Sequence, residues 1–309
     1  MLASPWARAA EAEYPNRPVT VVIPFAAGGN GDIVLRAIST PLAQRTGQPL
    51  VIDNRPGAGG LIGSAQVARA RPDGYTLLLT SNAQATSQSL VAAAPVDMAD
   101  DFLAISQLAT GSAILLVGAN SPLRSVADLV AAARAAPDTL KYASSGIGST
   151  PHLAMAMMAR MAGIELVHIP YRGVPQAVTD LLAGRVDLAF VNSSSALTYV
   201  DNGQMHPLGV SSARRSPLTR NLPAIAESVP GFEVLNWQGL VAPRGTPRPV
   251  IDQMNAALKV ALDDERTMQE FAKLGGTPSW STPEDLAAMT RAEIDRWRAV
   301  IREANITAQ

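Results

Sequence analysis

The sequence predicts an α/β protein made of two similar units, and three observations support this. Apolar runs of strand length alternate with segments of helical spacing along most of the chain, which indicates parallel strands joined by helices. A strand that leads through a glycine-rich turn into a helix occurs twice, at residues 19–45 and at residues 140–163. Two further apolar strands, within residues 113–122 and 237–247, stand where the chain could cross between the units.

The first unit begins with a buried strand at residues 19–25. Its last two residues open the sequence PFAAGG, which continues to Gly29. A helix is expected at residues 32–45, because Ile33, Val34, Ala37, Ile38 and Leu42 recur near helical spacing. The unit continues with a short strand at 50–52, a short helix at 63–74 that Pro72 and Gly74 close, and a strand at 75–81.

The second unit repeats this order. We expect a strand at 140–144, helices at 150–163 and 175–184, and strands at 166–171, 186–192 and 205–212. Near the C-terminus, Thr282 is expected to cap a helix whose first residue is Pro283. Its buried stripe is expected to contain Leu286, Met289, Ile294, Trp297 and Ile301.

These elements divide the chain into a short N-terminal segment and two lobes. We predict a residual signal or tail at residues 1–14, a discontinuous first lobe from 15–116 plus 240–309, and a second lobe from 117–239. Residues 1–14 contain Ala-Arg-Ala-Ala before a polar stretch, like the end of a secretory signal without its charged and apolar regions. A disordered alanine-rich tail is the alternative reading of this stretch.

Composition excludes several classes of protein. The 309 residues carry a net charge of −1, so nothing favours nucleic acid or an anionic membrane as partner. No apolar run is long enough to span a bilayer. Without cysteine there is no disulfide scaffold or thiolate metal site, and the three histidines lack the spacing of a local zinc motif. We therefore expect no metal and no cofactor.

The two glycine-rich turns are the candidate site. They run from Phe25 to Asp32 and from Ser144 to Pro151, and each leads into a helix. The first turn of a helix leaves N–H groups unpaired, its dipole favours negative charge, and glycine lets an anion approach the backbone. Ligands of open α/β sheets lie beyond the carboxyl ends of the strands. Two such turns that face each other would hold a small anion, although glycine turns before helices are also common for structural reasons alone.

Enzyme motifs are incomplete or missing. Both turns begin as G-x-G-x-x-G, but Val34 and Pro151 stand at the third glycine, which argues against a dinucleotide site. No phosphate-binding G-x-x-x-x-G-K-[ST] loop and no G-x-S-x-G nucleophile elbow occurs. We expect no catalytic residues, and keep a dinucleotide-using α/β enzyme only as an alternative.

Seven ordered blocks between Tyr14 and Ile301 resemble the Bug family, the periplasmic solute receptors of tripartite tricarboxylate transporters. Among them are YPNRPVTVVIPFAAGG, IDNRPGAGGLIGSAQVARARPDGYTLL, YASSGIGSTPHLA and GLVAPRGTPRPVIDQMNAAL. The resemblance implies a type II periplasmic-binding-protein fold, in which two α/β lobes joined by crossing strands close over a ligand. It also implies export to the periplasm, a monomer, and a small carboxylate gripped by the two turns with bridging waters and delivered to a membrane permease.

The implied ligand contacts can be given residue by residue. Backbone approach is expected at Gly28 and Gly29, and hydroxyl and N–H donors are expected in the second turn. Asp32 is expected to order its own turn, and contact with a ligand amine is the alternative. Ser81, Asn82, Tyr171, Gly173 and Asn192 end strands at the same rim. The full set of expected ligand-binding residues is Phe25, Ala27, Gly28, Gly29, Asn30, Asp32, Ser81, Asn82, Ser145, Gly146, Ser149, Thr150, Tyr171, Gly173 and Asn192.

The sequence departs from the family at two places near the expected site. Asn30-Gly31 replaces a small or Pro-Thr pair, and we expect the extra glycine to loosen this turn. Ala94-Pro95-Val96 stands where an aromatic residue is usual. Both departures bear on the identity of the ligand. A receptor that mainly signals to a sensor partner is the alternative to one that serves transport.

Overall fold

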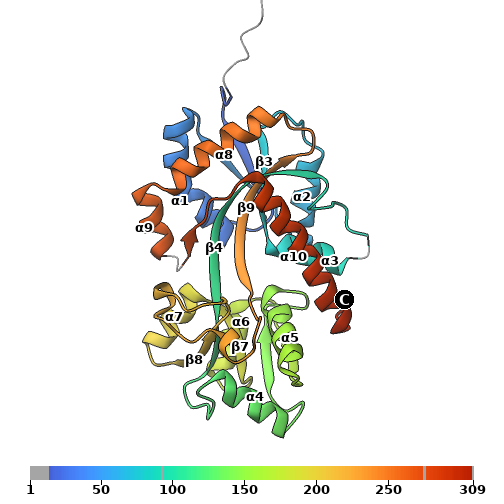
Figure 1. Cartoon of the computed structure of the whole chain (residues 1–309), viewed down its shortest axis with the longest axis vertical. Coiled ribbons are helices and arrows are strands. Elements are labelled where there is room, and N and C mark those ends of the chain that lie inside the picture. The colour runs from blue at the N-terminus through green and yellow to red at the C-terminus, as the bar shows by residue number, and fades with distance from the viewer. Residues whose placement is uncertain (1–13, 92, 274–275, 308–309) are drawn as a thin grey trace, which may run out of the picture.

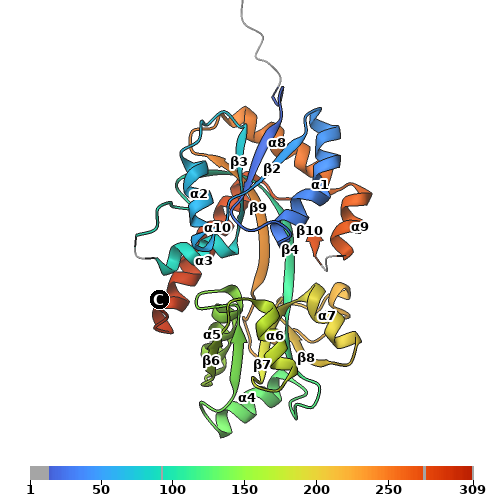
Figure 2. The same cartoon turned by 180° about the vertical axis from the view of Figure 1, so that it is seen from behind.

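The computed structural model describes residues 14–91, 93–273 and 276–307, and it has two α/β lobes placed end to end (Figures 1 and 2). The first lobe contains β1–β3, α1–α3, α8 and α9, and the second contains α4–α7 and β5–β8. Of residues 1–14, which we expected to be a residual signal or tail, residues 1–13 lie outside the described residues. Tyr14 packs against a core cluster of the first lobe and donates its hydroxyl to the Gly74 carbonyl, so it belongs to that lobe.

The elements have the following bounds. The strands are β1 (Val19–Ile23), β2 (Leu50–Asn54), β3 (Thr76–Ser81), β4 (Phe102–Gly118), β5 (Lys141–Ser144), β6 (Val167–Pro170), β7 (Leu188–Asn192), β8 (Met205–Val210), β9 (Leu235–Pro243) and β10 (Thr277–Pro278). The α-helices are α1 (Asn30–Thr46), α2 (Leu61–Ala68), α3 (Asn82–Leu90), α4 (Val126–Ala135), α5 (Thr150–Ala162), α6 (Val174–Leu182), α7 (Ser193–Asp201), α8 (Arg248–Leu262), α9 (Glu265–Lys273) and α10 (Pro283–Glu303), with 3₁₀ turns η1 (Ala58–Gly60), η2 (Pro217–Thr219) and η3 (Ile225–Glu227).

Strands β4 and β9 connect the lobes, as the sequence predicts. In the first lobe β1 pairs in parallel with β2 and β3, and β3 pairs antiparallel with β9. Strand β4 pairs with β9 from Phe102 to Ser112, and from Ala113 onward it pairs with β7 and β8 in the second lobe. One long strand therefore belongs to both sheets, and the crossing point lies near Ser112.

Helix α10 also touches both lobes. Its early residues Leu286 and Ile294 pack in a core cluster of the first lobe. Its later residues Trp297 and Ile301 pack in the main core cluster of the second lobe. Figure 1 shows the helix descending past α3 to end beside α5. We keep the predicted lobe boundaries as a proposal, with the addition that the last part of α10 shares the core of the second lobe.

The predicted elements are largely present, with shifts at their ends. The C-terminal helix starts as expected, because the Thr282 side chain accepts the Asp285 N–H and Pro283 is the first helical residue. Helix α1 begins at Asn30, two residues before the predicted start, so that Asp32 lies inside the first turn. Gly31 is therefore helical, and a Cβ there would collide with Leu79. The glycine permits close packing of α1 on β3.

Candidate ligand-binding site

A cavity of about 730 Å³ lies between the lobes, and it is lined by residues of both. Its walls come from the turn after β1, the start of α1, η1, α3, the turn after β5, the starts of α5 and α6, and strands β7 and β9. No Asp, Glu, Lys, Arg or His occurs among the described residues that line it. The lining is polar and apolar, but it carries no formal charge.

Four helices begin at this cavity. Helices α1, α3, α5 and α6 start at Asn30, Asn82, Thr150 and Val174, all of which are lining residues. Each first turn leaves N–H groups without an intrahelical partner and carries the positive end of a helix dipole. An anion in the cavity would therefore meet a favourable potential although no cationic side chain is present.

The first turn, residues 25–32, is ordered by Asp32. This carboxylate is 4% exposed and accepts hydrogen bonds from the Gly28 N–H at 3.1 Å and from Arg36 Nε at 2.9 Å. The Arg36 guanidinium, together with the Gly28 N–H, holds the pKa of Asp32 below its usual value despite its burial. Because Arg36 neutralises Asp32, the turn presents backbone rather than negative charge to the cavity.

The second turn, residues 144–150, folds on its own hydroxyls. The Gly146 N–H donates to Ser144 Oγ at 3.1 Å, and Ser149 Oγ donates to the Gly146 carbonyl at 2.7 Å. Gly146 and Gly148 have φ values of 127° and 73°, which favour glycine. Among the described contacts of this turn, the N–H groups of Ser145, Ile147 and Thr150 have no acceptor, so they are free for a ligand or for water.

A chain of amide side chains crosses the cleft. Asn82 Nδ2 donates to Thr150 Oγ1 at 2.9 Å, which joins α3 of the first lobe to α5 of the second. The same Asn82 amide lies 3.4 Å from Asn236 Oδ1, and Asn236 Nδ2 donates to Asn192 Oδ1 at 2.7 Å. The lobes are thus in direct polar contact at the cavity.

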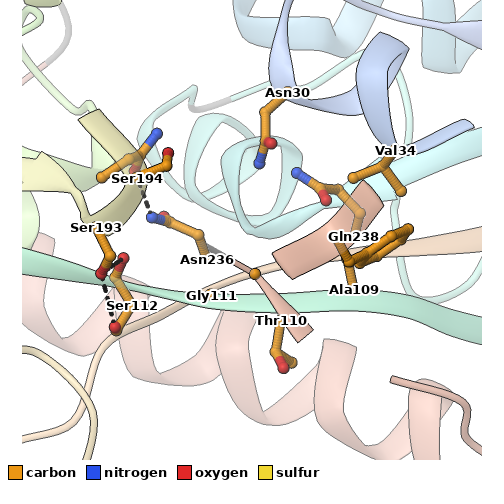
Figure 3. A pocket seen from close by; sticks show the side chains of 13 residues that line it. Asn30, Val34, Ala109, Thr110, Gly111, Ser112, Ser193, Ser194, Asn236 and Gln238 are labelled. Atoms are coloured by element: carbon orange, nitrogen blue, oxygen red, sulfur yellow. Dashed lines mark hydrogen bonds between the residues drawn. The ribbon is translucent and has the colours of Figure 1, made fainter. Parts of the chain in front are cut away.

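A smaller pocket of about 40 Å³ adjoins the cavity and shares Asn30, Asn192, Asn236 and Gln238 with it. Figure 3 shows Asn30 and Gln238 on one side of this pocket and Asn236 on the other, with Ser112 and Ser193 hydrogen-bonded beyond it. A polar pocket of this size suits an ordered water.

The structure brings most of the predicted site residues together. Nine of them line the large cavity: Phe25, Gly29, Asn30, Ser81, Asn82, Ser145, Ser149, Thr150 and Asn192. Ala27, Gly28, Asp32, Gly146, Tyr171 and Gly173 are not among the lining residues. Tyr171 instead donates its hydroxyl to Asp180 at 2.6 Å.

Sequence reasoning missed several lining residues. Asn236 and Gln238 lie on β9 on either side of the buried Trp237, and this alternation in LNWQG was the available signal. Leu90, Val91, Phe190 and Val234 add apolar surface to the cavity, and no local motif marks them.

The fold and cavity define a two-lobed binding protein, and comparison with known proteins identifies its family. Residues 34–306 match the family described as "Tripartite tricarboxylate transporter family receptor", and the chain belongs to it. The "UPF0065 protein in tcbD-tcbE intergenic region" of Pseudomonas sp. (strain P51) is 39% identical over 96% of this chain and 88% of its own length.

Two solved structures show the same fold. "R. palustris Rpa4515 with adipate" is 35% identical with a TM-score of 0.82, covering 96% of this chain and 99% of its own. "Structure of periplasmic binding protein BugD" is 33% identical with a TM-score of 0.79, covering 96% of this chain and 100% of its own.

The family confirms the predicted resemblance and class. Its members and these structural neighbours are periplasmic solute-binding receptors rather than enzymes, so the dinucleotide-using enzyme is set aside. Within the described residues, no helix combines the length and apolar character that crossing a bilayer would require.

Proposed function

We propose that this receptor captures a small carboxylate in the interlobe cavity and delivers it to the membrane subunits of a tripartite tricarboxylate-type transporter. The observation that carries the proposal is an uncharged cavity at which four helices begin. Such a cavity attracts a carboxylate through backbone N–H groups and hydroxyls, without the fixed geometry of a guanidinium.

The two turns have complementary parts in this proposal. The start of α1, at Gly29 and Asn30, approaches the ligand from the first lobe, and the Ser145, Ser149 and Thr150 region approaches it from the second. The polar 40 Å³ pocket beside Asn30 is where we expect a water that bridges the ligand to the protein. Six expected residues do not line the cavity, and we propose that they act by shaping these turns: Ala27, Gly28, Asp32, Gly146, Tyr171 and Gly173.

The comparisons support a carboxylate as the ligand class. The neighbour with a TM-score of 0.82 contains adipate, a dicarboxylate. The volume of about 730 Å³ falls within the usual range of small-molecule sites, and apolar residues such as Phe25 and Phe190 provide surface for the body of the ligand. Periplasmic export and action as a monomer belong to the same proposal.

A thermal-shift screen against mono-, di- and tricarboxylates, amino acids and aromatic acids tests the ligand class, after native mass spectrometry has excluded a co-purified ligand. A carboxylate at 100 times its dissociation constant should stabilise the protein by about 2.7 kcal/mol. No stabilisation by any carboxylate in the screen, in a protein shown to be free of co-purified ligand, would contradict the proposal.

A matched pair of charge variants tests the cavity itself. Asn30→Asp adds a negative charge to a lining that has none, while Asn202→Asp makes the same change at the opposite end of α7 from the cavity. Repulsion between unit charges at about 4 Å is worth about 1 to 4 kcal/mol, depending on the dielectric. We expect Asn30→Asp to weaken carboxylate binding at least about fivefold by calorimetry and Asn202→Asp to leave it unchanged. If Asn30→Asp bound the carboxylate as tightly as Asn202→Asp, the start of α1 would not be part of the ligand site.

A further inference from the structure

Three rings are stacked against one another beside the second turn. The stack contains Tyr142 from β5, His168 from β6 and His152 from α5, with the His168 ring in contact with both of the others. The ring centroids of Tyr142 and His168 are 4.8 Å apart, and those of His168 and His152 are 3.8 Å apart with an interplanar angle of 7°. His152 is 6% exposed. The pairing of β5 with β6 sets Tyr142 opposite His168, so the sheet fixes the stack.

His152 makes one bond to the turn. Its Nδ1 accepts the Gly148 N–H at 2.9 Å. An accepting Nδ1 has no proton, so the imidazole is neutral and carries its proton on Nε2. Gly148 is buried with a φ of 73°, and its N–H is taken up by this acceptor. The bond therefore fixes the Ile147–Gly148 peptide plane, which precedes Ser149 and Thr150 in the turn.

His168 supports the other end of the same turn. Its Nε2 is 2.7 Å from Ser144 Oγ, and this hydroxyl also accepts the Gly146 N–H and lies 3.0 Å from the Gly146 carbonyl. A hydroxyl has one proton to donate. All three contacts are satisfied together when His168 donates through Nε2 and Ser144 donates to the Gly146 carbonyl. His152 thus holds the turn as a neutral ring, while the contact of His168 requires a proton on its Nε2.

We infer that His152 is a positioning residue of the ligand site: by accepting the Gly148 N–H while stacked on His168, it fixes the 145–150 turn in the shape that presents its free N–H groups to a carboxylate. This inference rests on the proposed function for its ligand. It assigns no contact between His152 and the ligand. The role belongs to the neutral imidazole, because an Nδ1 that carries a proton cannot accept the Gly148 N–H.

Protonation should therefore loosen the turn. Burial lowers the pKa of His152 to about 4, with His168 contributing, and burial lowers the pKa of His168 to about 4. The titratable groups that face the pair are these two rings and Tyr142, which burial keeps protonated. Among the described residues no carboxylate or cation bonds to either ring. Ligand affinity should then decline as the pH falls toward 4.

Two substitutions of His152 test the hydrogen-bond acceptor and the stacking ring separately. His152→Asn places Oδ1 at the position of Nδ1, and so keeps an acceptor that does not titrate. His152→Phe keeps a stacking ring and removes the acceptor. His206→Phe is the matched control, because His206 lies on β8 and the only described hydrogen bond of its ring is with the Arg124 carbonyl at 3.3 Å.

The first readout needs no ligand. Amide hydrogen exchange at Gly148, followed by NMR, should be slow in the wild type and in His206→Phe. Because the N–H loses its acceptor, it should be about tenfold faster or more in His152→Phe. His152→Asn should restore most of the protection. In the wild type the exchange, corrected for its intrinsic pH dependence, should accelerate as the pH approaches 4, and in His152→Asn this acceleration should disappear.

The second readout is binding of adipate by calorimetry. We expect His152→Phe to weaken it about tenfold or more and His152→Asn to stay within about threefold of the wild type. Gly148 exchange that is equal in the wild type and His152→Phe would overturn the inference, as would equal adipate affinity in these two proteins. Failure of the proposed function is separate: a wild type that binds no carboxylate contradicts that proposal, and the exchange measurement then decides the role of His152 alone.

Discussion

Removal of the Asn82 side chain is the most direct test of how the lobes are held together. Asn82 lies at the start of α3, is 5% exposed, and donates across the cleft to Thr150 Oγ1 at 2.9 Å. Its contact with Asn236 is 3.4 Å long and shares the same nitrogen. We therefore count one good interlobe hydrogen bond.

The expected magnitude follows from that count. A net hydrogen bond contributes about 0.5 to 1.5 kcal/mol. An Asn82→Ala variant that loses about 1 kcal/mol of interlobe contact shifts the balance between closed and open lobes about fivefold toward the open form. If the ligand binds the closed form, its apparent dissociation constant rises by up to the same factor.

The assay is a double-mutant cycle read by calorimetry with a bound carboxylate, together with small-angle scattering of the free proteins. The cycle combines Asn82→Ala with Thr150→Val, which removes the accepting hydroxyl and keeps the side-chain shape. We expect a coupling of about 1 kcal/mol and a larger radius of gyration in either single variant. A coupling below about 0.3 kcal/mol would show that the two side chains act independently and would refute the reasoning.

Three further predictions concern stability. Trp297→Ala should cost about 3 to 5 kcal/mol in urea unfolding, because Trp297 is fully buried in the second lobe's core. The free energy of unfolding should fall as the pH drops from 6.5 toward 4, because unfolded His152 gains a proton before the folded form does. His152 alone contributes a slope of up to about 1.4 kcal/mol per pH unit, His168 adds to it in the same direction, and a flat profile would contradict the prediction. Gly148→Ala should destabilise more than Gly163→Ala in thermal melts: both have positive φ, but a Cβ at Gly148 collides with Leu90 and one at Gly163 meets open space.

The sequence predicts the fold well where local pattern and burial agree. The apolar run of β1, the glycine turn after it and the capped start of α10 are each set by residues adjacent in the chain. Helix α3 was not predicted, because NAQATSQSL has no apolar stripe. Its side chains pack against α10, about 200 residues later, and this contact supplies the stabilisation that the segment lacks on its own.

The site divides in the same way. Phe25, Gly29 and Ser149 could be placed because the carboxyl ends of parallel strands meet at one edge. Asn236 and Gln238 could not, because which face of a crossing strand meets the cleft is decided only when both lobes have assembled around it. Asp32 illustrates a third case. Its place in the first turn could be predicted from the sequence, but the ion pair with Arg36, which leaves Asp32 to hold the turn, is seen only in the structure.

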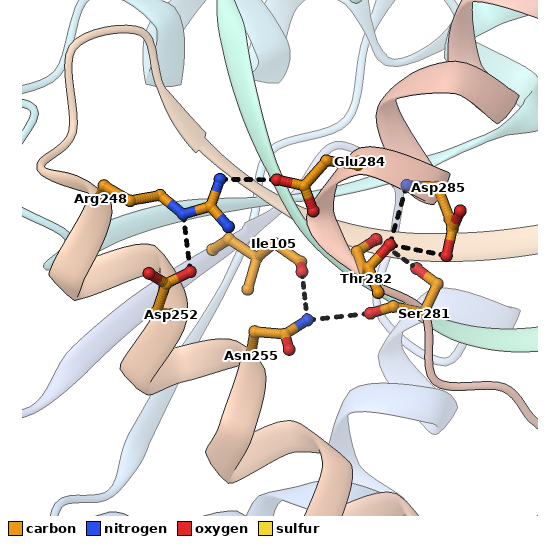
Figure 4. Close-up of polar contacts among 8 residues, drawn as sticks. All are labelled: Ile105, Arg248, Asp252, Asn255, Ser281, Thr282, Glu284 and Asp285. Carbon is orange, nitrogen blue, oxygen red and sulfur yellow. Dashed lines mark hydrogen bonds and ion pairs between the residues drawn. The ribbon is translucent and has the colours of Figure 1, made fainter.

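Helix α10 has a consequence for how the protein unfolds. It is fixed in the first lobe, where Glu284 pairs with Arg248 and Asn255 donates to the Ser281 carbonyl (Figure 4). Its later residue Trp297 lies inside the core of the second lobe. Neither lobe can lose its packing without exposing part of this helix and of β4. The two lobes should therefore denature in a single cooperative transition rather than in two, although each has a sheet of its own.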